Sequence, residues 1–174
     1  MSDCTVSLVT ELGVVGISLH VQAAPHTCSY FLGDVDRGVF DRSTIFRIVT
    51  LRHAPPPGRP AIEVMQGGSP PIDMNIKPSI RHESTNLTGL RHRRGTISLA
   101  RFSPGAAYHS FFVCFRDEPS LDFGGDRQPD GQGFAAFGDT LYGWDVLDKL
   151  RQCAEPDEML CKPLQLRVAR VAPG

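Results

Sequence analysis

Two short apolar runs on either side of a loop constrain this chain most. In Thr96–Ala100, Ile97 and Leu99 alternate with small or polar residues, which is the period-two pattern of a strand with one buried face. Phe111–Phe115 is aromatic and β-branched, a composition typical of a strand buried on both sides. The connection between them, Phe102–His109, is too long for a tight hairpin turn. We therefore expect binding groups in this loop, because loops on a rigid sheet commonly carry them.

Most of the remaining chain is also predicted to form short strands. Helices are predicted from Pro25 onward, since proline suits the first helical turn, and over Trp144–Cys153, where Leu147 and Leu150 share one face. Eight strands and two helices in this order, with no internal repeat, predict a mainly β protein built as an antiparallel barrel. The other predicted strands cover Thr5–Thr10, Val14–Val21, Ile45–Thr50, Ile62–Gln66, Phe134–Leu141 and Leu164–Val171.

Length and charge bound the class of protein. A chain of 174 residues is large enough for one domain with a single core. A net charge of −1 argues against a dedicated nucleic-acid or membrane-surface protein, and no apolar run approaches the roughly 18 residues of a membrane span. The start of the sequence lacks a basic segment followed by an apolar one, so we expect no signal peptide and a cytoplasmic location. We also expect a monomer.

Several motifs resemble known binding sites but lack the sequence context that such sites need. Gly131-Gln132-Gly133 opens a weak dinucleotide-binding match, but it follows a loop and precedes a β-like segment. Neither cysteines nor histidines cluster at ligand spacing, so we expect no metal and no cofactor. The basic segment Arg91–Arg94 leaves RNA binding as an alternative function, although such runs are usually solvated loops.

Arg47 is the most informative single residue. It lies in the middle of an apolar strand, Ile45–Val49, where a cation must point toward something polar. Taken alone, this position fits a structural ion pair as well as a functional group.

Five ordered blocks stand out along the sequence: Ile45–Val49, Gln66–Gly68, Gly95–Arg101 with Ser110–Val113, Leu121–Asp122 and Phe134–Gly138. Together they resemble the blocks of the cyclophilins, which are peptidyl-prolyl cis–trans isomerases, and of the bacterial branch in particular. The resemblance extends from Val6 to Val171. It implies one domain over residues 1–174, a closed eight-stranded antiparallel β-barrel capped by a helix at each end, and a Pro-rich insertion at 51–61.

The resemblance also implies the site. Arg47 falls at the family's catalytic arginine, Gln66 would bind the substrate backbone or position Arg47, and Phe112 would be the floor of the proline pocket. Ala100 and Arg101 would present main-chain groups to the residues before the proline. The implied substrate-binding positions are Glu63, Val64, Ala100, Arg101, Ser110, Ser120, Leu121 and Phe134.

Some of these positions depart from the family pattern. Glu63 stands for a phenylalanine, Ser120 for a tryptophan, Phe134 for a histidine and Ser110 for a glutamine. We therefore expect an isomerase for proline-containing peptides and unfolded proteins, assisting folding as a chaperone, that binds cyclosporin weakly. A non-catalytic proline-peptide binding module is the alternative.

Overall fold

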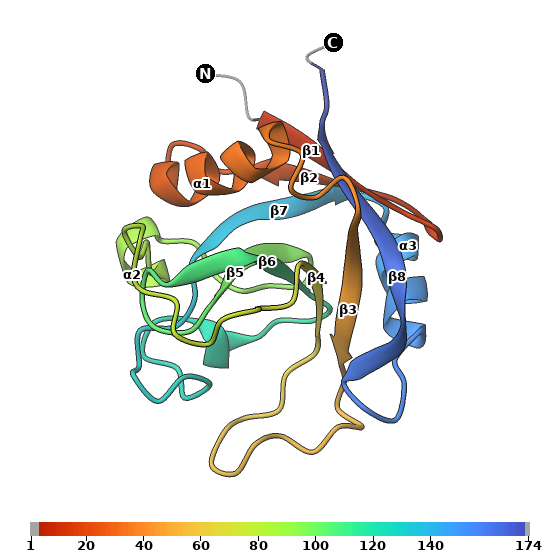
Figure 1. The fold of residues 1–174 in the computed structure, drawn as a ribbon. Helices are drawn as coiled ribbons and strands as arrows, with labels where there is room; N and C mark the ends of the chain where they lie inside the picture. Colours follow the sequence, from red (N-terminus) through yellow and green to blue (C-terminus); the bar gives the residue numbers. More distant parts are fainter. Residues whose placement is uncertain (1–3, 173–174) are drawn as a thin grey trace.

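Residues 4–172 are described by the computed structural model, and they form a closed barrel of eight antiparallel strands (Figure 1). The order around the barrel is β1-β2-β7-β5-β6-β4-β3-β8. The predicted fold class is therefore confirmed. The strands are β1 (Cys4–Thr10), β2 (Gly13–Leu19), β3 (Ser43–Val49), β4 (Val64–Gly68), β5 (Thr96–Arg101), β6 (Ala107–Cys114), β7 (Ala136–Tyr142) and β8 (Met159–Arg170).

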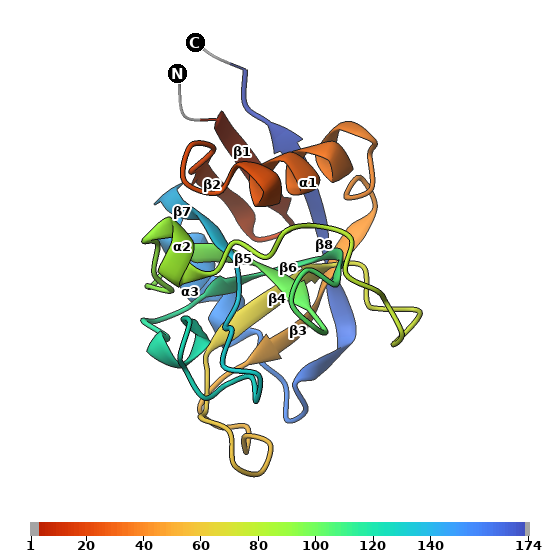
Figure 2. The same cartoon turned by 90° about the vertical axis from the view of Figure 1, so that its left-hand side faces the viewer.

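Two helices contribute side chains to the barrel interior. α1 (Pro25–Asp36) begins at Pro25 as predicted, and α3 (Trp144–Gln152) follows β7. Figures 1 and 2 place them on different sides of the barrel. A third helix, α2 (Thr85–Thr88), and the 3₁₀ turn η1 (Pro119–Leu121) were not predicted, because a single turn carries no periodicity to read. No helix within residues 4–172 is both long and apolar enough to cross a bilayer.

Two strands begin at least four residues earlier than the sequence suggests. β6 begins at Ala107, so the connection from β5 to β6 is Phe102–Ala106. The predicted C-terminal boundary of this loop, His109, is therefore wrong. β8 begins at Met159, where that residue pairs with Arg47 of β3. In both cases pairing with a neighbouring strand extends the strand beyond its apolar pattern, as tertiary context commonly does.

The barrel strands bury side chains on both faces. The inner face holds the main core, in which the ring of Phe31 lies 5.0–5.5 Å between centroids from Phe40, Phe111 and Phe137. A second, smaller cluster contains Val49, Val64 and Phe112, which alternate with inward-facing residues along β3, β4 and β6 and therefore lie on the outer face. Ile62, Cys114, Leu121 and Phe134 complete this outer cluster.

The segment 51–61 has neither helix nor strand, as its three consecutive prolines predict. Figure 2 shows the chain between β3 and β4 projecting from the lower side of the barrel. It lies beside the outer cluster, because Ile62 at its end belongs to that cluster.

Replacing Phe31 by alanine is expected to destabilise the barrel strongly. Phe31 is fully buried among three other rings, so Phe31→Ala should lower the free energy of unfolding by about 3–5 kcal/mol, measured by urea denaturation. Phe123→Ala is the matched control, since Phe123 is 42% exposed and its loss should be under about 1 kcal/mol. Equal losses in the two variants would contradict this description of the core.

Candidate active site

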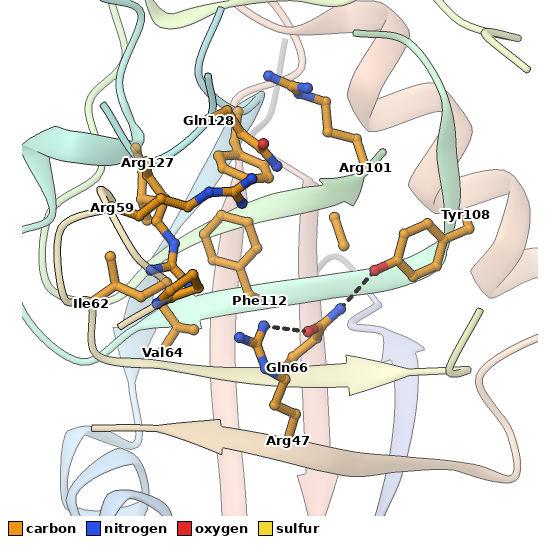
Figure 3. Close-up of a pocket in the computed structure, with 14 residues that line it drawn as sticks. Arg47, Arg59, Ile62, Val64, Gln66, Arg101, Tyr108, Phe112, Arg127 and Gln128 are labelled. Atoms are coloured by element: carbon orange, nitrogen blue, oxygen red, sulfur yellow. Dashed lines mark hydrogen bonds between the residues drawn. The ribbon is translucent and has the colours of Figure 1, made fainter. Parts of the chain in front are cut away.

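Three of the predicted site residues lie in one row across neighbouring strands. Arg47 of β3 pairs with Gln66 of β4, and Gln66 pairs with Phe112 of β6. The register of β3 shifts between Ile45 and Arg47, which marks a β-bulge. Because of this extra residue, Ile45 and Ile48 both reach the inner core while Arg47 lines the outer pocket. Figure 3 shows the three side chains side by side.

A hydrogen-bond network fixes the orientation of Gln66. Arg47 Nη1 donates to Gln66 Oε1 at 3.2 Å, and Gln66 Nε2 donates to the Tyr108 hydroxyl and to Ser110 Oγ, both at 3.0 Å. Arginine has no acceptor, so the amide oxygen of Gln66 must face Arg47. Burial raises the pKa of Tyr108, which keeps its hydroxyl protonated at neutral pH.

A carboxylate holds the Arg47 guanidinium from its other edge. Glu158 Oε2 accepts from Arg47 Nη2 at 2.7 Å and from Nε at 3.0 Å. Together with the bond to Gln66, three of the five N–H groups have partners among residues 4–172. Two N–H groups therefore stay available, on a side chain that is 25% exposed and lines a pocket.

This pocket is a cavity of about 220 Å³ over the outer cluster. Its floor is the ring of Phe112, which meets the ring of Phe134 edge-on at 5.3 Å between centroids. A typical small-molecule site has about 300–1,000 Å³, so this cavity suits one ring of a larger ligand. Eight predicted site residues line it: Arg47, Val64, Gln66, Ala100, Arg101, Phe112, Leu121 and Phe134.

The side chain of Arg101 organises the pocket wall. Its Nη1 and Nη2 donate to the two carboxylate oxygens of Asp130 at 2.8 and 3.0 Å, and its Nε donates to the carbonyl of Gly133 at 2.9 Å. The guanidinium lies 5.1 Å from the centre of the Phe134 ring. Arg101 lowers the pKa of Asp130 through these hydrogen bonds, so the ion pair is intact at neutral pH. Arg101, a residue of β5, thus fixes the loop between η1 and β7 through its contacts with Asp130 and Gly133.

A buried polar pair supports the floor from behind. His92 stacks on Phe112 with 5.9 Å between ring centroids, and its Nδ1 lies 2.8 Å from Asp122 Oδ1. Burial raises the pKa of Asp122, but hydrogen bonds from His92 outweigh burial and the net shift is downward. The ionised Asp122 carboxylate can only accept, so His92 donates from Nδ1. The pair fixes Leu121, the neighbour of Asp122, beside Phe112.

Three predicted substrate-binding residues do not line the cavity. The Glu63 carboxylate points elsewhere, accepting from Arg151 Nη2 at 2.7 Å and from the Leu51 N–H at 3.0 Å. Arg151 pairs with the charge of Glu63, so this carboxylate is not presented to the pocket. Ser110 lies behind Gln66 and donates to the Gly67 carbonyl at 3.0 Å. Ser120 is in η1, and its short side chain does not reach the cavity.

Several residues of the site were missed by sequence reasoning. Tyr108 lies two and four residues before Ser110 and Phe112, so period two would have placed it on the same face had the start of β6 been recognised. Glu158 had no recognisable signal, because only the fold brings it to Arg47. The other lining residues that were missed are Pro56, Arg59, Ile62, Arg127 and Gln128.

The basic segment Arg91–Arg94 does not form a continuous basic row. His92 is buried against Asp122, and Arg94 pairs with Asp148 at 2.9 Å while lying 5.2 Å from the centre of the Trp144 ring. Within this segment, Arg91 and Arg93 are the exposed cations that have no carboxylate partner in the described part of the chain. The segment thus offers little to a phosphate backbone.

Comparison with known proteins agrees with this geometry. The chain matches the family model described as "Cyclophilin type peptidyl-prolyl cis-trans isomerase/CLD" over residues 5–171. It is 34% identical over 151 residues to peptidyl-prolyl cis-trans isomerase A of Dickeya dadantii, covering 84% of this chain and 70% of that protein. It is 30% identical to peptidyl-prolyl cis-trans isomerase cyp18 of Streptomyces antibioticus, covering 84% and 82%.

Solved structures show the same fold. A cyclophilin type peptidyl-prolyl cis-trans isomerase of Cryptosporidium parvum superposes with a TM-score of 0.76 at 17% identity, covering 99% of this chain and 100% of that one. A structure of that protein in the presence of the dipeptide Ala-Pro gives 0.74 at 18% identity, covering 97% and 99%. The family predicted from five sequence blocks is confirmed by the match along nearly the whole chain, and this protein belongs to the cyclophilin-type peptidyl-prolyl cis-trans isomerases.

Proposed function

We propose that this enzyme rotates X–Pro peptide bonds with the prolyl ring on Phe112 and the Arg47 guanidinium at the prolyl nitrogen. The observation that carries this proposal is the row Arg47–Gln66–Phe112 at the edge of a cavity sized for one ring. Proline-containing segments of unfolded or flexible chains are the substrates, and the protein acts on them as a monomer that assists folding.

The chemistry needs one well-placed hydrogen-bond donor. The peptide bond resists rotation because nitrogen shares its lone pair with the carbonyl, and the barrier is about 18–20 kcal/mol. As the bond twists, the lone pair localises on the prolyl nitrogen and becomes an acceptor. A donor aimed at that nitrogen binds the twisted state more strongly than the planar one, and this difference is what accelerates a reaction.

Arg47 is held for this task by its neighbours. Glu158 and Gln66 engage three of its N–H groups and leave one on Nη1 and one on Nη2. A guanidinium fixed on two edges loses little freedom when a substrate arrives, which favours preorganised donation. Gln66 Nε2 is committed to Tyr108 and Ser110, so Gln66 positions Arg47 and is left with acceptor capacity at Oε1.

A binding module without turnover would use the same pocket but would not need an oriented donor. Exchange NMR separates the two functions, because an isomerase broadens or exchanges the cis and trans signals of a proline peptide and a binding module only shifts them. The uncatalysed exchange takes tens to hundreds of seconds, so catalysis is readily detected.

Arg47→Ala is expected to lower kcat/KM for a proline peptide at least ~100-fold, the usual cost of losing one preorganised donor. Arg47→Lys should also be strongly impaired, since an ammonium cannot reproduce the fork that engages Glu158 and Gln66 together. Circular dichroism serves as the folding control. Turnover like that of the unmodified protein in Arg47→Ala would refute the mechanism.

Phe112→Ala is expected to affect both activity and stability. The side chain is the pocket floor and also joins the outer cluster, so its loss should raise KM and lower the free energy of unfolding by about 3–5 kcal/mol. Phe112→Leu keeps most of the apolar volume and should retain more of both. An active and equally stable Phe112→Ala protein would show that the proline does not bind on this ring.

Cyclosporin is expected to inhibit this enzyme weakly. Cyclophilins commonly carry a tryptophan at this position, and Ser120 cannot offer its broad ring and indole N–H. Aromatic anchors of this kind often dominate binding energy. Ser120→Trp should tighten inhibition while changing small-peptide turnover much less, measured as residual activity during titration. Ser120→Leu is the control that adds apolar volume without the indole N–H. Tight inhibition of the unmodified protein would contradict the expectation.

A further inference from the structure

One side of the pocket carries two arginines that the catalytic row does not use. Arg59 comes from the Pro-rich loop 51–61 and Arg127 from the loop between η1 and β7, and both line the same cavity as Phe112. Figure 3 shows them near Ile62, on one side of the Phe112 ring, with Arg101 and Tyr108 on the other side. Two separate loops therefore deliver positive charge to one rim of the pocket.

Neither guanidinium is neutralised by a carboxylate. Arg127 is only 7% exposed, yet its one side-chain hydrogen bond within residues 4–172 runs from Nη1 to the Pro60 carbonyl at 2.9 Å. The side chain of Arg59 makes neither a hydrogen bond nor an ion pair with the described part of the chain. The other two pocket arginines are paired, Arg47 with Glu158 and Arg101 with Asp130.

The local field on this rim is therefore positive. Burial lowers the pKa of Arg127, and the nearby charges of Arg47 and Arg59 lower it further, while Glu158 opposes them. An arginine keeps its charge at neutral pH despite such a shift. A buried cation without a counter-charge is costly, and an anion that binds there recovers part of that cost.

The Pro-rich loop keeps the two groups together. The backbone N–H of Arg59 donates to the Pro56 carbonyl at 3.0 Å, which closes a turn. The carbonyl of Pro60, the residue after Arg59, accepts the hydrogen bond from Arg127 Nη1. Consecutive prolines restrict the backbone of this loop, so less freedom is lost when a ligand binds. The loop thus supplies one arginine and anchors the other.

We propose that Arg59 and Arg127 form a subsite for an anionic side chain of the substrate, located in the one or two residues that follow the proline. This proposal rests on the isomerase function proposed above. The position follows from the layout, because Ala100 and Arg101, which are expected to contact the residues before the proline, lie on the β5 side of the pocket and Arg101 is opposite the two arginines. Guanidinium forks match both carboxylate and phosphate oxygens, so a glutamate or a phosphoserine could supply the anion.

The experiment compares short proline peptides that differ at one position. Glutamate, glutamine, phosphoserine or serine is placed one or two residues after the proline, and glutamate or glutamine directly before it. Exchange NMR gives kcat/KM, and chemical-shift titration gives the affinity. We expect at least about a five-fold advantage of glutamate over glutamine after the proline, or of phosphoserine over serine, and the larger ratio identifies the source of the anion. No advantage in rate or affinity, or an advantage only before the proline, would overturn the subsite.

Variants test whether these arginines cause the preference. Arg59→Gln and Arg127→Gln should each reduce the ratio of anionic to neutral peptide at least two-fold, and the ratio within each variant is the readout. Arg93→Gln removes the same charge from an exposed residue outside the pocket and should leave the ratio unchanged. Arg59 lies on a surface loop, so its variant remains informative even if Arg127→Gln does not fold. An unchanged ratio in Arg59→Gln would refute its role.

The same peptides separate failure of this subsite from failure of the isomerase proposal. If the neutral peptide is turned over and the anionic peptide gains nothing, the enzyme stands and the subsite is wrong. If no peptide is turned over but the anionic peptide binds more tightly, the subsite stands and the catalytic proposal is wrong.

Discussion

The pairing of β3, β4 and β6 is the constraint on which the site depends. Arg47, Gln66 and Phe112 face one another across two strand pairs, so their spacing is set by the ladder of backbone hydrogen bonds. The bulge before Arg47 is equally necessary, because strict alternation would turn that side chain toward the same face as Ile45, which is fully buried in the core. One extra residue in the strand therefore places the Arg47 guanidinium in the outer pocket, where without it the guanidinium would be an unpaired charge in the core.

Side chains packed on both faces stabilise these strands. Phe111 and Val113 point into the barrel, while Phe112 and Cys114 point into the outer cluster, so β6 is held from both sides. The outer cluster is closed by loops, and each loop is itself fixed by buried polar groups. Asp122 holds His92 behind Phe112, and Arg101 holds Asp130 beside Phe134. The donor Arg47 and the floor residue Phe112 thus lie on paired barrel strands, which suits the proposed reaction because it needs a donor in one place.

The sequence could predict whatever depends on local pattern. Strand periodicity located all eight strands, and Arg47, Gln66 and Phe112 stood out because their neighbours form recognisable blocks. Properties that arise from packing could not be read in the same way. Glu63 was expected at the rim, but the fold brings Arg151 of α3 to it, and Glu158 reaches Arg47 only through the path of the chain between α3 and β8. Tyr108 was missed because pairing, and not apolar character, begins β6 at Ala107.

Under the proposed mechanism, the altered pocket rim is expected to change which peptide binds more than it changes the rate of bond rotation, and the reason is thermodynamic. In the proposed mechanism Arg47 donates to a nitrogen whose lone pair exists as an acceptor only in the twisted state, so its contribution differs between ground and transition states. Contacts with Arg59 and Arg127 involve side chains away from the rotating bond, which have the same charge in the planar and twisted states. Such contacts lower the energy of both states equally and alter which peptide is held, not how fast the held bond turns. A cyclophilin barrel can therefore exchange an aromatic rim for a cationic one while β3, β4 and β6 keep the chemistry unchanged.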